Sequence, residues 1–103
     1  MSGPTLTVGP GVIREMVRLA AFEVPGVAKV GRGGPPWRVL AGRAVSARVR
    51  NDRVEVRLWI VARPGHPLGP LVAQVRSAVA ATVERLLGLE LGAVTVLVDG
   101  VGG

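Results

Sequence analysis

The chain has 103 residues, with 13 lysines and arginines against seven acids, so its net charge is +6. No cysteine is present, which excludes disulfides and thiolate metal ligands, and this length allows one small domain over residues 1–103 with a single core. The N-terminus lacks a leader pattern and no apolar run reaches the roughly 20 residues of a membrane span, which predicts a cytoplasmic protein without a transmembrane segment of its own.

The N-terminal part of the chain predicts a strand, a helix and a second, short strand. Residues 5–8 form the first candidate strand. In residues 12–24 the apolar side chains recur at three- and four-residue steps, which is the spacing of an amphipathic helix. Pro25 and Gly26 predict its end, because proline cannot continue a helix and glycine accepts a left-handed turn. Residues 27–30 are a possible short strand.

The central part of the chain predicts a β-hairpin. Residues 45–49 and 54–60 carry apolar side chains at alternate positions, which is the period of a half-buried strand pair. Asn51 and Asp52 supply the turn between the two strands. The same alternation sends a mostly cationic set of side chains to the opposite face. These are Ser46, Arg48, Arg50, Arg53, Glu55, Arg57 and Trp59.

The C-terminal part of the chain predicts a loop, a helix and a last strand. The loop covers residues 63–70, and the helix covers residues 71–87 with Gly88 as its left-handed C-terminal residue. Residues 94–98 are apolar on nearly both faces, which is typical of an interior strand, and Asp99 follows as its end.

The order of these elements predicts the fold class. Strands and helices do not alternate strictly, which favours an α+β fold over a parallel α/β fold. We expect a small, mostly antiparallel sheet with a central β-hairpin and two helices packed on one face. The other face of the sheet is then open to solvent or to a partner.

Residues that support catalysis or metal binding are scarce. The chain has one histidine, no cysteine and no tyrosine. His66 lies between Gly65 and Pro67, where a turn residue is a better interpretation than a catalytic base. No cluster of His, Asp or Glu has the spacing of a zinc site. We therefore expect a protein that is not an enzyme, with no catalytic residue, no metal site and no cofactor.

The net charge is concentrated in one stretch. Residues 32–63 hold eight arginines against two acids, and the rest of the chain is neutral. The candidate contact residues are Arg48, Arg50, Arg53, Arg57 and Trp59. Such a face can bind nucleic-acid phosphates with Trp59 stacked on a base, or an acidic protein surface, or an anionic bilayer. It can also be solvated surface that discourages edge aggregation.

Three segments together resemble the alkaline shock protein family of small bacterial envelope stress response proteins. The first, AAFEVPGVAKV, is similar to that family's helix ending in a Glu-Val-x-Gly-Val turn. The second is the hairpin VSARVRNDRVEVRLWIVA followed by GHPLGPLVAQV. The third, VRSAVAATVERLLGLELGAVTVLVDGV, carries Gly-Leu-Glu after the helix and a closing Val-x-Val-x-Val-x-Gly-Val. The resemblance extends over residues 6–101.

The resemblance implies a non-enzymatic cytoplasmic protein that helps to maintain the cell envelope under stress. It implies a protein partner anchored in the membrane, which would bring the chain to the membrane, and self-association into a homo-oligomer. The family has no catalytic residues to assign to this chain. The residues themselves leave one alternative open, a nucleic-acid-binding module that uses the same arginine-rich face and would bind with a steep salt dependence.

Overall fold

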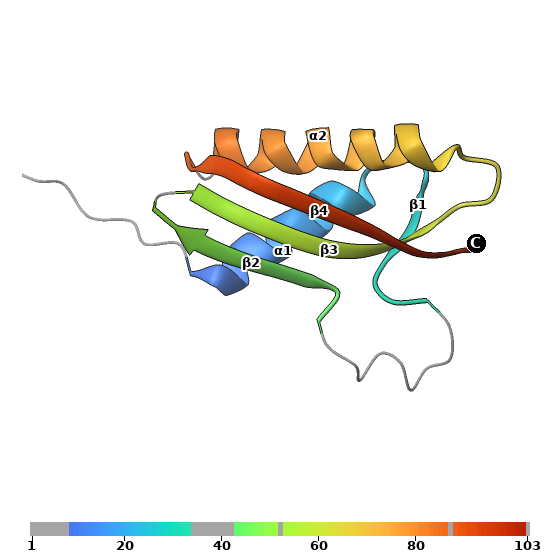
Figure 1. Cartoon of the computed structure of the whole chain (residues 1–103), viewed down its shortest axis with the longest axis horizontal. Coiled ribbons are helices and arrows are strands. Elements are labelled where there is room, and N and C mark those ends of the chain that lie inside the picture. The colour runs from blue at the N-terminus through green and yellow to red at the C-terminus, as the bar shows by residue number, and fades with distance from the viewer. Residues whose placement is uncertain (1–8, 34–42, 52, 87, 103) are drawn as a thin grey trace, which may run out of the picture.

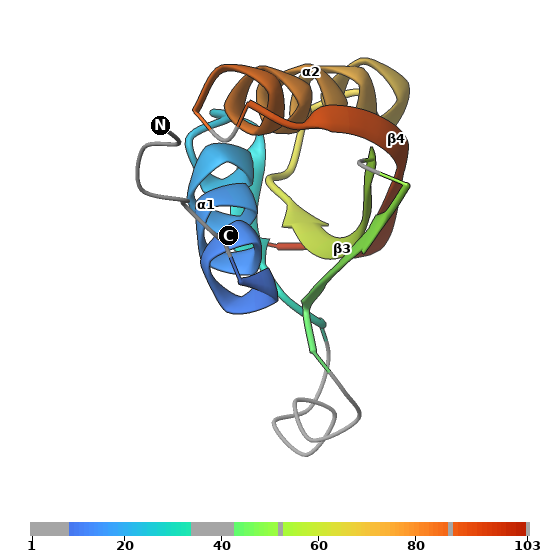
Figure 2. The ribbon, with the colours of Figure 1, turned by 90° about the vertical axis from the view of Figure 1, so that its left-hand side faces the viewer.

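The computed structural model describes residues 9–33, 43–51, 53–86 and 88–102. In these residues, two helices pack on one face of a four-stranded sheet (Figure 1). The elements are α1 (Pro10–Phe22), β1 (Val27–Val30), β2 (Val45–Arg50), β3 (Arg53–Ala62), α2 (Leu68–Leu86) and β4 (Glu90–Val101). The predicted α+β class is confirmed, with both helices on the same side of a curved sheet (Figure 2). The predicted strand at residues 5–8 lies outside the described residues.

Strand β3 is the centre of the sheet and contacts the other three strands. β2 pairs antiparallel with its first part, from Arg50↔Arg53 to Val45↔Leu58. β1 pairs antiparallel with its last part, where Val30 lies opposite Ile60. Because β4 occupies the other edge of β3 along its whole length, β1 and β2 must share one edge and follow each other end to end.

The last strand differs from its prediction. β4 is longer than residues 94–98, runs parallel to β3 after the α2 crossover, and pairs with β3 alone within the described sheet. It is therefore an edge strand, and the prediction of an interior strand was wrong. Its two apolar faces have another cause: Val94, Val96 and Val98 pack against the core, while Leu97 lies beside Trp59 on the opposite face.

The core lies between the sheet and the two helices. The predicted strand alternation is confirmed, because Val54, Val56, Leu58 and Ile60 are all at most 2% exposed. The two helices supply apolar stripes at helical spacing. These residues are Ile13, Val17 and Ala21 from α1, and Leu71, Val75, Val79 and Val83 from α2. No polar or charged residue is buried in the described part of the chain.

The predicted turn at Asn51 and the predicted left-handed Gly88 are confirmed, and the predicted left-handed Gly26 is not. Asn51 has φ +51° in the hairpin turn, and Gly88 has φ +65° after α2. Gly26 is not among the residues with positive φ. A Cβ there would lie 2.7 Å from Leu71 Cδ1 and 2.8 Å from His66 Nδ1, so close packing, not a left-handed turn, requires this glycine.

The second helix begins earlier than predicted. α2 starts at Leu68, so the last residues of the expected loop form its first turn. Pro70 is compatible with this start because the first turn of a helix does not use its backbone N–H groups as intrahelical donors.

Candidate functional site

The predicted contact residues share one face of the sheet. Ser46 lies opposite Arg57, Arg48 opposite Glu55, and Arg50 opposite Arg53. Directly opposed residues of an antiparallel pair point to the same side. The alternate pairs, which include Val45↔Leu58, point to the helices. We call the side away from the helices the open sheet face. Its central residues are Ser46, Arg48, Arg50, Arg53, Glu55, Arg57, Trp59, Thr95 and Leu97.

The open sheet face is hollowed along the middle of β3. A shallow groove crosses from β2 to β4 and is lined by Ser46, Arg48, Glu55, Arg57, Ala93 and Thr95. A second hollow shares Glu55 and Ala93 with it and continues toward Arg50, Asn51, Arg53 and Gly92. The lining side chains from β4 are small, and those of Arg48, Glu55 and Arg57 from β2 and β3 are long.

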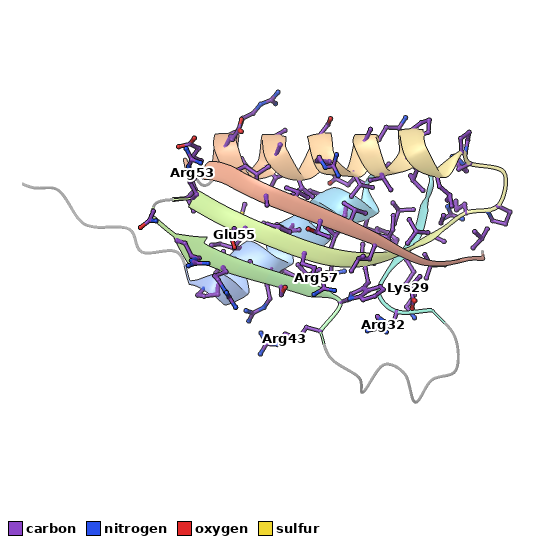
Figure 3. The ribbon with its side chains drawn as sticks, viewed as in Figure 1. Lys29, Arg32, Arg43, Arg53, Glu55 and Arg57 are labelled. Atoms are coloured by element: carbon purple, nitrogen blue, oxygen red, sulfur yellow. The ribbon has the colours of Figure 1, made fainter. Side chains whose placement is uncertain are left out.

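Most cations of this face form no ion pair with an acid that the structure describes. Arg53 Nη2 lies 3.4 Å from Glu90 Oε1, with both side chains more than half exposed. Arg48 stands opposite Glu55, but no ion pair forms between them in the structure. Within the described residues, Arg50 and Arg57 of this face also form no ion pair, and neither do Lys29 and Arg43 near its end. Figure 3 labels Lys29, Arg43 and Arg57. The face therefore presents a positive field that its own acids do not cancel.

Trp59 marks the point where β1 and β2 meet. The Gly31 N–H donates to the Trp59 carbonyl oxygen at 2.9 Å, and the Trp59 N–H donates to the Ala44 carbonyl oxygen at 2.8 Å. One residue of β3 thus holds both the segment that leaves β1 and the segment that enters β2. A cation stands next to each of these hydrogen bonds, because Arg32 follows Gly31 and Arg43 precedes Ala44.

A network between Arg32 and Asp99 covers Trp59 and was missed by sequence reasoning. The Arg32 guanidinium carbon lies 3.9 Å from the Trp59 ring centroid, and that of Arg57 lies 6.0 Å from it. The Asp99 carboxylate accepts a hydrogen bond from the Gly33 N–H at 2.7 Å and lies 3.4 Å from Arg32 Nε. In the nucleic-acid alternative Trp59 would stack on a base, and Arg32 already occupies one face of its ring.

The prediction that Asp99 ends a strand was wrong, because Asp99 lies inside β4. Its side chain is 14% exposed and is tied to the segment after β1. The segment comes so close that a Cβ on Gly33 would lie 2.6 Å from the Asp99 carbonyl oxygen. The available signal was an acid directly after the mostly apolar residues 91–98, far from the other acid of β4, Glu90 at its first position.

We expect Asp99→Ala to lower the free energy of unfolding by about 1–3 kcal/mol, because the part-buried Gly33 N–H and Arg32 would lose their acceptor. The matched control is Glu90→Ala on the same strand, whose exposed ion pair should contribute about 0–1 kcal/mol. Urea unfolding of both variants is the measurement. Equal losses would show that the Asp99 network does not stabilise the fold.

Glu15 and Arg18, a pair on α1, have shifted pKa values. The Arg18 guanidinium donates to the Glu15 carboxylate, with Nε to Oε2 at 3.1 Å, and lowers the pKa of Glu15 below its ordinary value. The same hydrogen bonds raise the pKa of Arg18. Both groups are exposed, and neither belongs to the open sheet face.

The described residues contain neither a metal cluster nor a membrane-spanning helix. No three His, Asp or Glu side chains of this part of the chain lie close enough together to hold a metal ion. No helix in residues 9–33, 43–51, 53–86 and 88–102 has both the length and the apolar character needed to cross a bilayer.

Comparison with known proteins gives a family and a fold. The family model for the alkaline shock protein 23 family, described by a cell envelope-related function, matches residues 3–102. Solved structures of MamM CTD variants are similar in fold, including a nickel form at 17% identity and a manganese form at 18%. Each has a TM-score of 0.63 and covers 87% of this chain and 96% of the other. No curated protein matches the chain significantly in sequence.

Proposed function

The chain belongs to the alkaline shock protein 23 family, whose function is related to the cell envelope, and we propose that it is a non-enzymatic binding protein of the envelope stress response. In this proposal it works in the cytoplasm, close to the membrane. It docks a protein partner on the open sheet face, and a membrane-anchored partner brings it to the envelope. The contact residues are Arg48, Arg50, Arg53, Arg57 and Trp59.

One observation carries this proposal: one side of the sheet is covered by helices and the other side is uncovered and cationic. The residues that face the helices form a closed apolar core without buried charge in the described part. On the opposite side, Arg48, Arg50 and Arg57 pair with no described acid, and Arg48 and Arg57 line a shallow groove. A positive face of this kind complements an acidic partner surface and speeds encounter with it.

Self-association is compatible with the same sheet. In the described part of the chain, β4 forms one outer edge and β1 and β2 together form the other, so both edges have backbone groups that another strand could pair with. We propose a homo-oligomer as part of the scaffold role. A closed two-fold dimer would keep the two open sheet faces available to partners.

Nucleic-acid binding is the alternative function for this face. The arginines on β2 and β3 favour it, because they could neutralise successive phosphates. The Trp59 ring disfavours it, because Arg32 lies 3.9 Å from the ring centroid and one face is not free for a base. We therefore place the protein partner first.

The nickel and manganese forms are forms of MamM CTD, and their metals are not carried over to this chain. We propose no resident metal for this chain, because its described residues include no cluster of ligands.

Affinity capture from nuclease-treated native lysate tests the proposed function. The wild type is compared with a variant that carries alanine at Arg48, Arg50, Arg53 and Arg57, and mass spectrometry identifies what each form retains. We expect the wild type alone to retain an envelope or membrane-anchored protein. If both forms lose all bound material after nuclease treatment, nucleic acid is the partner and the proposal is wrong.

A further inference from the structure

Cations from three separate segments lie at the end of the sheet that holds Trp59, where Arg32 and Arg57 are the two nearest its ring. Lys29 belongs to β1, Arg32 follows it, Arg43 precedes β2, and Arg57 lies on β3. Figure 3 shows Lys29, Arg32 and Arg57 near the end of the sheet where β1 and β2 meet, with Arg43 extending outward just before β2. We call Lys29, Arg32, Arg43 and Arg57 the cationic junction. The hydrogen bonds of the Trp59 backbone to Gly31 and Ala44 hold it together.

The junction is partly fixed in position. Arg32 is held between the Trp59 ring and the Asp99 carboxylate, and its side chain is only 19% exposed. The stem of Lys29 lies over Gly31, since a Cβ on Gly31 would lie 2.9 Å from Lys29 Cε. Ordering these long side chains in advance lowers the entropy lost when they bind an anion.

The junction has an excess of positive charge. Asp99 is the acid that contacts it, through Arg32, while Lys29, Arg43 and Arg57 form no ion pair with any described residue. These three side chains are also exposed. The junction therefore presents three exposed cations that no described acid pairs with.

We propose that the cationic junction binds lipid phosphate groups and lets this protein contact an anionic membrane surface directly. This goes beyond the proposed function, in which an anchored partner brings the protein to the membrane. Guanidinium groups match phosphate geometry with paired N–H donors, and basic clusters bind anionic bilayers through the summed attraction of their charges.

The shape of the junction favours a broad anionic surface over an extended acidic peptide or a single nucleic-acid strand. The groove on the open sheet face includes Arg57 but none of the other three junction cations. An extended strand in that groove would therefore leave most of the junction unused. The covered Trp59 ring also removes one face from base stacking. A bilayer, in contrast, can contact side chains that project from three different segments.

Vesicle co-sedimentation of the purified full chain tests this proposal. The vesicles contain phosphatidylcholine alone or with about a third phosphatidylglycerol, at a fixed moderate ionic strength. The junction variant is Lys29→Gln with Arg43→Gln. The matched control is Arg76→Gln with Arg85→Gln, which removes the same charge from exposed positions of α2. Thermal unfolding checks that both variants remain folded.

We expect the wild type to sediment with the anionic vesicles and not with the neutral ones. Each cation at the membrane surface should change the partition coefficient about fivefold. We therefore expect the partition coefficient of the junction variant to fall about 25-fold and that of the control to fall less than about twofold. Equal losses in the two variants would overturn the proposal, because net charge would then explain binding. Failure of the wild type to sediment, with binding to a single-stranded oligonucleotide instead, would also overturn it. Since the vesicles hold no protein, these results are independent of the capture experiment.

Discussion

Replacing Leu58 with alanine should lower the free energy of unfolding by about 3 kcal/mol, within the range of about 2–5 kcal/mol for buried leucines. Leu58 is fully buried on β3, where it lies between Val45 of β2 and Val96 of β4. Its removal therefore leaves a cavity at the centre of the sheet that neighbouring strands cannot easily fill. A small domain has a total stability of about 5–15 kcal/mol, so the loss is a large fraction of it.

Urea unfolding of the wild type and of Leu58→Ala measures this loss. Leu86→Ala is the control, because Leu86 is 68% exposed at the end of α2. We expect the control to change stability by less than about 0.5 kcal/mol. Similar midpoints for the two variants would contradict the placement of the core between the sheet and the helices.

Charge reversal on the open sheet face should abolish capture of the partner. We choose Arg50→Glu with Arg57→Glu, because neither new acid would stand opposite another acid. Arg50 lies opposite Arg53, and Arg57 lies opposite Ser46 and Thr95. The change converts attraction to an acidic partner into repulsion, which costs several kcal/mol and should weaken binding on the order of a hundredfold or more.

The comparison variant for this experiment is Arg50→Lys with Arg57→Lys. It keeps the charge and the length of the side chains but loses the planar fork of arginine. Retained capture with lysine and loss with glutamate would support an electrostatic interface. Retained capture with glutamate would show that the partner binds another part of the molecule.

The parts of the fold that depend on local patterns were predictable from the sequence. The alternation from Val54 to Ile60 sets which side of β3 is buried, because neighbouring side chains of a strand point to opposite faces. The helical stripes of α1 and α2 are local in the same sense. For that reason the alternation alone was enough to place the arginines of the hairpin on one face.

The parts that depend on distant partners were not predictable. A strand that is apolar on both faces can lie in the middle of a sheet, or at its edge with one face beside a residue such as Trp59. The sequence of β4 is compatible with both positions, and only tertiary packing decides between them. Arg32 and Asp99 are 67 residues apart, and no spacing rule joins them. The end-to-end placement of β1 and β2 also arises from their shared partner, so the cationic junction could not be derived from the sequence.

The central claim, that the partner docks on the open sheet face, is tested most directly by site-specific photo-crosslinking in cells. A photo-reactive amino acid replaces Ser46 or Thr95, both exposed on that face, or Ser77, exposed on α2. We predict a crosslinked adduct with the same envelope protein from the first two positions and none from Ser77. Adducts from Ser77 with none from Ser46 and Thr95 would contradict the account, because they would place the partner on the helices.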